Sequence, residues 1–81
     1  MSPYIDEAQR LAVAATGPKK PGELNYVITV IIKDYVEQKS PPSYADLNEV
    51  LGVLEAVKQE FYRRVVAPYE EMKKAKNGDV Y

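Results

Sequence analysis

A stripe of large apolar residues in the C-terminal half constrains this chain more than any other feature. Between Ser43 and about Lys76 the apolar side chains recur at three- and four-residue spacing: Leu47, Val50, Leu51, Leu54, Val57, Phe61, Val65, Tyr69 and Met72. This spacing puts them on one face of an α-helix, which turns once in about 3.6 residues. The rest of a chain of 81 residues can hardly cover so long a face, so we expect partner chains.

Composition limits the ways in which such a small chain is stabilised. Chains of this size bury only about 60% of their unfolded surface, and disulfides, metals or oligomerisation usually supply what is missing. The sequence has no Cys and no His, which excludes disulfides and the common zinc sites. We therefore expect no metal and no cofactor, and a homodimer or higher homo-oligomer.

Charge and hydropathy argue against two classes of partner. The chain carries 11 basic and 12 acidic residues, for a net charge of −1, whereas proteins that bind nucleic acid usually have a basic face. Its longest uncharged stretch, Leu24 to Ile32, is far too short to span a bilayer. The N-terminus also lacks the basic region of a signal peptide. Nucleic acid and membrane are disfavoured, and we expect a cytoplasmic protein.

The first half of the chain predicts two helices. The first is expected in residues 1–16, where Ser2 can cap it and Pro3 suits the first helical position. Residues 17–22, with two prolines and two glycines, form a connector. The second helix is expected in residues 23–39.

The run Val27–Ile32 in the second segment is strongly β-branched, which makes a strand a real alternative. Helix is favoured because the main apolar residues fall within an arc of roughly 140° on a helical wheel: Leu24, Val27, Ile28, Ile31, Ile32 and Tyr35. A strand would instead place the charged Lys33 and Asp34 on opposite faces.

A third helix is expected in residues 43–76, followed by a tail of residues 77–81. Ser43 and Asp46 have the spacing of a capping box. Pro68 lies inside the helix and removes the donor that the Arg64 carbonyl would use. A kink around Arg64–Pro68 is therefore expected, or a full stop followed by a new short helix. The fold predicted is one all-α domain, residues 1–81, with a short first helix packed on an antiparallel hairpin of the two longer helices.

No catalytic motif is visible. There is no histidine or cysteine to act as base or nucleophile, and there is no glycine-rich phosphate loop. The carboxylates of Glu49, Glu55 and Glu60 could in principle act as acid or base, but solvated helix faces explain them. We expect no enzyme.

Lys58 is the first candidate binding residue. On the helical wheel it falls within about 20° of the middle of the apolar stripe, where a charge must extend to solvent, form an ion pair or meet a ligand. Glu55, three residues earlier, could pair with it. The alternative is a cationic anchor for an anion.

The other candidate binding residues are aromatic or cationic: Tyr62, Arg63, Arg64, Tyr69 and Tyr26. On the wheel Tyr62 and Tyr69 lie on the side of Lys58, whereas Arg63 points nearly opposite and Arg64 lies at the edge of the stripe. Stacking tyrosines and forked arginines suit a nucleotide-like ligand or a protein hot spot. Packed tyrosines, with ion pairs such as Glu60–Arg64 and Glu70–Lys74, explain the same residues structurally.

Three stretches resemble an uncharacterised family of small phage and prokaryotic proteins. They are Pro3-Tyr4-Ile5, the run GELNYVIT from Gly22 to Thr29, and the block Leu47–Tyr81 with its YRRVVAPYE and NGDVY segments. The resemblance implies no activity and no catalytic residues. It does suggest a phage or mobile-element setting, and hence the cytoplasm of a host.

Two functions follow as hypotheses. The first is a non-enzymatic, homo-oligomeric interaction protein, such as a phage-encoded modulator that binds a host protein or other macromolecule. The alternative is an oligomer that sequesters a nucleotide-type anion, with tyrosines stacking on the base and Lys58, Arg63 or Arg64 holding phosphate. Nucleic-acid binding through Lys73, Lys74 and Lys76 is least favoured, because Glu70 and Glu71 offset them.

Overall fold

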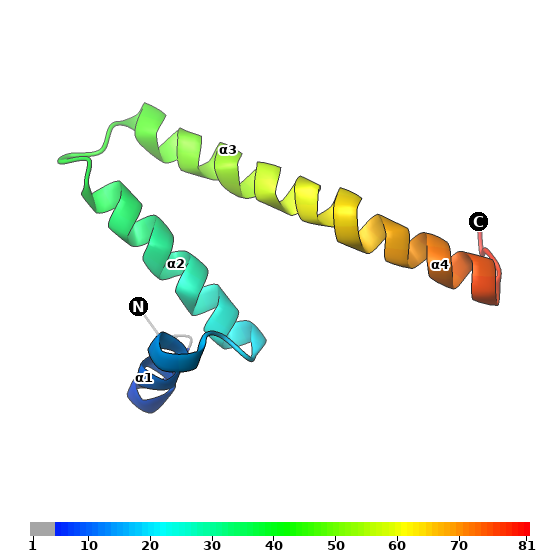
Figure 1. The fold of residues 1–81 in the computed structure, drawn as a ribbon. Coiled ribbons are helices and arrows are strands. Elements are labelled where there is room, and N and C mark those ends of the chain that lie inside the picture. The colour runs from blue at the N-terminus through cyan, green and yellow to red at the C-terminus, as the bar shows by residue number, and fades with distance from the viewer. Residues whose placement is uncertain (1–4) are drawn as a thin grey trace. The chain divides into compact units, whose positions relative to one another are not determined.

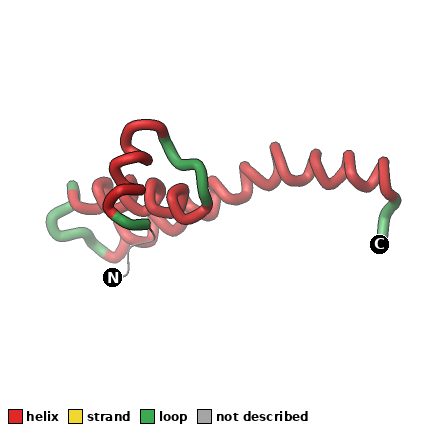
Figure 2. Tube along the Cα trace, turned by 90° about the horizontal axis from the view of Figure 1, so that it is seen from below, coloured by secondary structure: helices red, strands yellow, loops and turns green. Residues whose placement is uncertain are grey.

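The chain is all-helical in the structure, a computed structural model that describes residues 5–81. The helices are α1 (Glu7–Thr16), α2 (Pro21–Glu37), α3 (Tyr44–Phe61) and α4 (Ala67–Asn77), and a π-helical turn η1 (Tyr62–Val66) connects the last two. α3 runs through η1 into α4 as one helix (Figure 1), which we call the joined helix. Counted in this way the chain has three helices, as predicted, and no strand occurs in residues 5–81 (Figure 2).

Contacts within the chain gather in two units, Met1–Asp46 and Leu47–Tyr81, and each is described by itself. The first unit contains α1, α2 and the start of α3. The second is the remainder of the joined helix with its tail. The single domain and the antiparallel packing of the two longer helices stay predictions.

The first helix begins later than the sequence suggested. Asp6 is the N-cap, and it forms a capping box in which its carboxylate accepts from the Gln9 backbone N–H at 2.8 Å while the Gln9 side chain accepts from the Asp6 N–H at 3.2 Å. The expected cap Ser2 and the expected first residue Pro3 lie outside the described residues. Gly17 ends α1 at a positive φ of 82°, a conformation that glycine adopts without steric cost.

Glu23 connects α1 to α2. Its carboxylate accepts from the Lys19 backbone N–H at 2.9 Å and from the Gln9 side-chain amide at 3.3 Å. Glu23 is buried in spite of its charge, and the Lys19 hydrogen bond holds the pKa of its carboxyl below the ordinary value. The predicted contact of the first helix with the second is therefore present, through a polar network beside the buried Ile5 and Val13.

α2 resolves the alternative at Val27–Ile32 in favour of a helix. It begins at Pro21, where a missing N–H does no harm because the first helical N–H groups have no intrahelical partner. It ends at Glu37, two residues before the expected end.

The capping box predicted at the start of the third helix is formed. The Ser43 hydroxyl accepts from the Asp46 N–H at 3.1 Å, and the Asp46 carboxylate accepts from the Ser43 N–H at 2.9 Å. This acceptor role keeps the pKa of Asp46 below its ordinary value.

The kink predicted near Pro68 takes the form of η1. The Ala67 N–H donates to the Tyr62 carbonyl, five residues back, where a regular α-helix bonds four residues back. Proline has no N–H to donate to the helical hydrogen bonds, and its ring crowds the carbonyl four residues earlier. A π-helical turn just before Pro68 accommodates both effects without ending the helix.

Candidate protein-interaction surface

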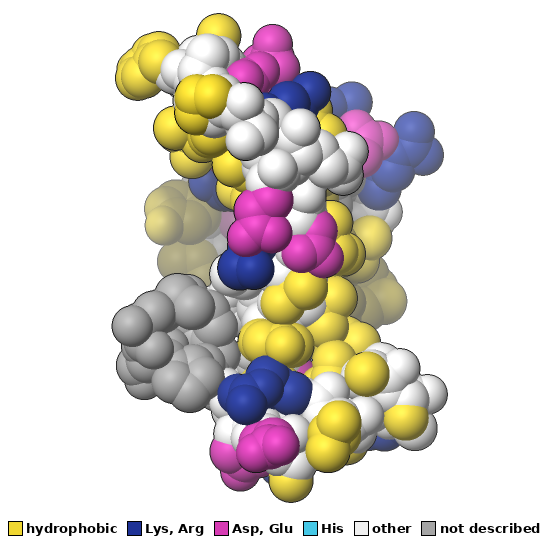
Figure 3. All heavy atoms as spheres, turned by 90° about the vertical axis from the view of Figure 1, so that its left-hand side faces the viewer, with side chains coloured by type: hydrophobic (Ala, Val, Ile, Leu, Met, Phe, Trp, Pro, Cys, Tyr) yellow, Lys and Arg dark blue, Asp and Glu magenta, His cyan; other side chains and the backbone are white. Residues whose placement is uncertain are grey.

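The apolar stripe of the joined helix lies exposed. No residue of Tyr44–Asn77 is buried, and the large stripe residues Leu51, Val57 and Phe61 are 65%, 61% and 59% exposed. Hydrophobic side chains reach the surface on the face drawn in Figure 3 as well. Among residues 5–81 the buried apolar side chains are Ile5 and Val13, both in the first unit, so the stripe is not buried within the second unit.

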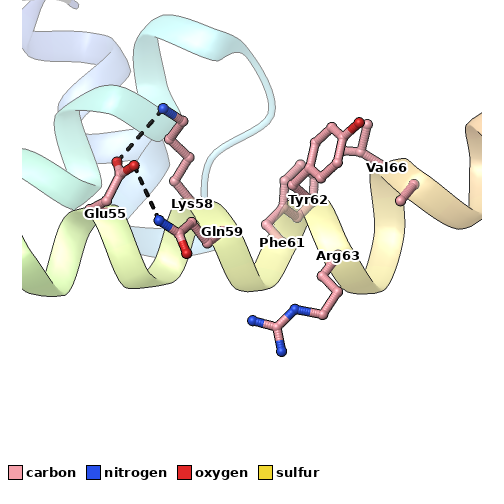
Figure 4. A pocket seen from close by; sticks show the side chains of 8 residues that line it. Glu55, Lys58, Gln59, Phe61, Tyr62, Arg63 and Val66 are labelled. Carbon is pink, nitrogen blue, oxygen red and sulfur yellow. Dashed lines mark hydrogen bonds and ion pairs between the residues drawn. The ribbon is translucent and has the colours of Figure 1, made fainter.

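An open groove follows the joined helix at the π-helical turn. Its lining combines the apolar Phe61, Val66 and Ala67 with the polar Lys58 and Tyr62. Glu55, Gln59 and Arg63 complete it. Figure 4 shows the Lys58 and Gln59 side chains both reaching back to Glu55, and Arg63 extending from the opposite side of the helix.

Lys58 forms the ion pair that its position suggested. Its Nζ lies 3.6 Å from the Glu55 carboxylate, and 77% of the side chain is exposed. Gln59 donates to the same carboxylate at 3.4 Å. Lys58 thus extends from the stripe to solvent with a partner, and an exposed pair of this kind contributes only about 0–1 kcal/mol.

Both arginines of the candidate set pair with Glu60. Arg63 lies 3.6 Å from its carboxylate, and Arg64 contacts the other oxygen of the same group. The expected Glu60–Arg64 pair is therefore present. The two guanidinium groups point to a carboxylate on their own helix, and an incoming anion would have to compete with it.

Tyr62 makes a contact that the sequence did not suggest. Its hydroxyl donates to the Glu70 carboxylate at 2.7 Å, eight residues further on. Eight residues of regular α-helix leave two side chains roughly 80° apart around the axis, whereas one extra residue in a turn reduces this to roughly 20°. The π-helical turn therefore brings Tyr62 and Glu70 onto one side, and the hydrogen bond raises the pKa of the Tyr62 phenol above its usual range.

This contact changes a pairing expected from the sequence. Because Glu70 accepts from Tyr62, the expected Glu70–Lys74 pair is replaced: Lys74 lies 3.3 Å from Glu71 and 3.7 Å from Asp79. The kink expected around Arg64–Pro68 does not specify a turn with one extra residue, so the contact of Tyr62 with Glu70 across η1 was not predicted.

The last two candidates lie apart from this cluster along the chain. The Tyr69 ring on α4 lies beneath the Lys73 ammonium, 5.7 Å from its centroid. Tyr26 is half-buried on α2 in the first unit. Of the six candidates, the structure groups Lys58, Tyr62 and Arg63 around one groove.

Residues 5–81 contain no group of three or more Asp, Glu, His or Cys side chains arranged to hold a metal ion. In the same residues no helix is both long enough and apolar enough to cross a membrane.

Comparison with known proteins gives one match. The family model described as domain of unknown function DUF6899 matches residues 2–80. Nothing matches among curated proteins or among solved structures. Since the family model covers nearly the whole chain, the protein belongs to the DUF6899 family.

Proposed function

We propose that this protein is a non-enzymatic interaction module that self-associates and binds another macromolecule through its helical faces. The observation that carries the proposal is the exposed apolar stripe of the joined helix. Leu47, Leu54 and Met72, near its two ends and between them, are 45%, 37% and 54% exposed. A continuous row of exposed apolar side chains usually marks a site of protein contact.

The energetics of a lone helix support the same proposal. An isolated helix gains little from propensity alone and is normally stabilised by packing its apolar face. Within Tyr44–Asn77 no side chain is buried, so this stabilisation has to come from another surface. A partner that covers the stripe supplies it.

The polar residues support a protein partner rather than a phosphate ligand. Lys58, Arg63 and Arg64 each have a glutamate of the same helix as partner, so positive charge is locally balanced. Tyr62 and Tyr69 then contribute large amphipathic surfaces, of the kind enriched in protein hot spots.

The setting proposed for this function is a phage or mobile element acting in the cytoplasm of its host. The support for it is the resemblance of GELNYVIT, YRRVVAPYE and NGDVY to small phage and prokaryotic proteins. Occupying a surface of a host protein would suffice as a mechanism, and it requires no catalytic group.

Native mass spectrometry of the full chain, purified gently from its host, tests the proposal. The expected result is an oligomer without a small-molecule adduct. A monomer at micromolar concentration would remove self-association from the proposal. An oligomer carrying extra mass of nucleotide size would replace it with the sequestering function.

A further inference from the structure

The apolar stripe contains a heptad pattern with one residue too many. Starting at Leu47, the positions Val50, Leu54, Val57 and Phe61 follow at alternating steps of three and four, which is the a/d pattern of a coiled coil. The pattern would continue at Arg64, Pro68 and Glu71. The apolar residues instead lie one position later in each case, at Val65, Tyr69 and Met72.

The π-helical turn occupies the place of the extra residue. η1 spans Tyr62–Val66, between the last residue of the regular pattern and the first shifted one. A turn closed five residues back holds one residue more than a turn closed four back. The extra residue is absorbed there, and Val65, Tyr69 and Met72 continue the line that Leu47–Phe61 began.

We call these eight residues the heptad seam: Leu47, Val50, Leu54, Val57, Phe61, Val65, Tyr69 and Met72. We propose that a second copy of this chain covers the heptad seam, with the two joined helices antiparallel. The inference rests on the self-association proposed above and specifies its partner and orientation.

The order of residues along the seam fits an antiparallel pair. With the copies crossing at about residue 59, every a residue meets a d residue of the second copy. The layers are Leu47 with Met72, Val50 with Tyr69, Leu54 with Val65, and Val57 with Phe61. Each layer occurs twice, and no seam residue is left without an apolar partner.

Charge complementarity also selects this orientation. Residues 44–61 carry four acidic side chains and one basic, for a net charge of −3, whereas residues 62–77 carry five basic and two acidic, for a net charge of +3. An antiparallel pair places each acidic half beside a basic half, and a parallel pair places like beside like. The helix dipole favours acidic residues in the first turn and basic residues in the last turn only. It does not explain the charges in the middle of the joined helix, at Glu55, Glu60, Arg63 and Arg64.

The seam is exposed along its whole length, which leaves it available to a partner. Leu47, Phe61 and Met72, at its start, middle and end, are 45%, 59% and 54% exposed. α2, with 17 residues, is only about 25 Å long, whereas the joined helix is about 50 Å long at 1.5 Å per residue. A helix of its own length, such as a second copy offers, can cover the whole seam.

Distance measurement between two spin labels tests the orientation in the full chain. The protein has no Cys, so Asn48→Cys and Gln59→Cys each introduce a single site for a label, and both positions are exposed and outside the seam. In the antiparallel pair the two Asn48 sites lie about 33 Å apart along the axis, while the two Gln59 sites, near the crossing point, lie within about 20 Å. In a parallel pair both distances are short.

The outcomes separate this inference from the function that it rests on. A dimer with a long Asn48 distance and a short Gln59 distance supports the antiparallel pair. A dimer in which both distances are short overturns this inference and leaves self-association standing. A monomer, shown by sedimentation of the labelled and unlabelled chains, overturns both.

Discussion

The two units of this molecule differ in how far they bury their own apolar side chains. In the first unit α1 and α2 are connected within the chain, by the hydrogen bonds from Gln9 and Lys19 to Glu23 and by the buried Ile5 and Val13. In the second, the joined helix keeps its apolar residues exposed along its length. The first unit therefore has a small core of its own, and we propose that the second gains its packing by association.

A charge placed in the heptad seam should weaken association of the joined helix the most and leave the first unit intact. In Phe61→Glu the seam would bury an unpaired carboxylate, which costs several kcal/mol, so we expect the dissociation constant of the oligomer to rise at least about 100-fold. Sedimentation equilibrium measures this, and the hydrogen bonds of the first unit should persist in NMR spectra. The matched control is Gln59→Glu, which adds the same charge at an exposed position outside the seam; an equal loss in this control would contradict the role of the seam.

Pro68→Ala should have the next largest effect, by changing the register of the seam. The new N–H at residue 68 can bond to the Arg64 carbonyl, and a regular helix interior favours alanine over proline by about 3 kcal/mol. Without the π-helical turn, Val65, Tyr69 and Met72 turn away from Leu47–Phe61 by roughly 100°. We expect a more helical monomer that associates about tenfold more weakly, as measured by circular dichroism and sedimentation.

A second variant sharpens this prediction. Deleting Arg63 together with Pro68→Ala removes the extra residue, so the seam becomes a regular heptad without any π-helical turn. Association should return to the wild-type strength or exceed it. If the double variant associates as weakly as Pro68→Ala alone, the π-helical turn does not serve to keep the seam in register.

Acidification should weaken the first unit through Glu23. Because the pKa of Glu23 is lower in the folded chain than its ordinary value of 4.5, its hydrogen bonds contribute stability above that pH, and the contribution is lost as pH falls through the lowered pKa. The protection factor of the Lys19 amide, which corrects for the pH dependence of intrinsic exchange, should therefore fall over this range. Glu23→Gln should remove most of this pH dependence while Glu7→Gln, at an exposed position of α1, should retain it.

The smallest effect is expected for Tyr62→Phe. This change removes the hydrogen bond to Glu70 on an exposed surface, so the oligomer should remain and only amide exchange near Val66 and Ala67 should accelerate slightly. Because Glu70 raises the pKa of the Tyr62 phenol, the hydrogen bond is present below the ordinary value of 10.0 and is lost as pH rises through the raised value. Tyrosine NMR shifts that titrate identically in wild type and Glu70→Gln would contradict this account.

Local chemistry made much of the fold predictable. The capping box of Ser43 and Asp46 and the break at Pro68 follow from hydrogen bonds within a few residues, and both are confirmed. The helical state of Val27–Ile32 follows from the periodicity of its apolar residues in spite of their β-branching. These hydrogen bonds and this periodicity involve residues within one or two helical turns of each other, so they can be predicted from the sequence alone.

The side-chain contacts across η1 were less predictable, because they depend on how far the helix rotates between the two residues. The Tyr62–Glu70 hydrogen bond spans eight residues, and a one-residue change in the turn between them decides whether they face each other. Proline signals that a helix is disturbed, but several kinds of disturbance satisfy the same rule. The capping box of Asp6 and Gln9 was missed for another reason, since Ser2 and Pro3 offered an equally regular start.

The exposure of the joined helix has a consequence for how the protein would act during its synthesis in a cell. When a helix gains its packing only from a second copy, its stability is inseparable from the number of copies present. On the pairing proposed here, the first molecules made would have poorly protected C-terminal halves, open to proteolysis. Only after accumulation would paired, long-lived molecules predominate, so the onset of activity would be delayed and then steep.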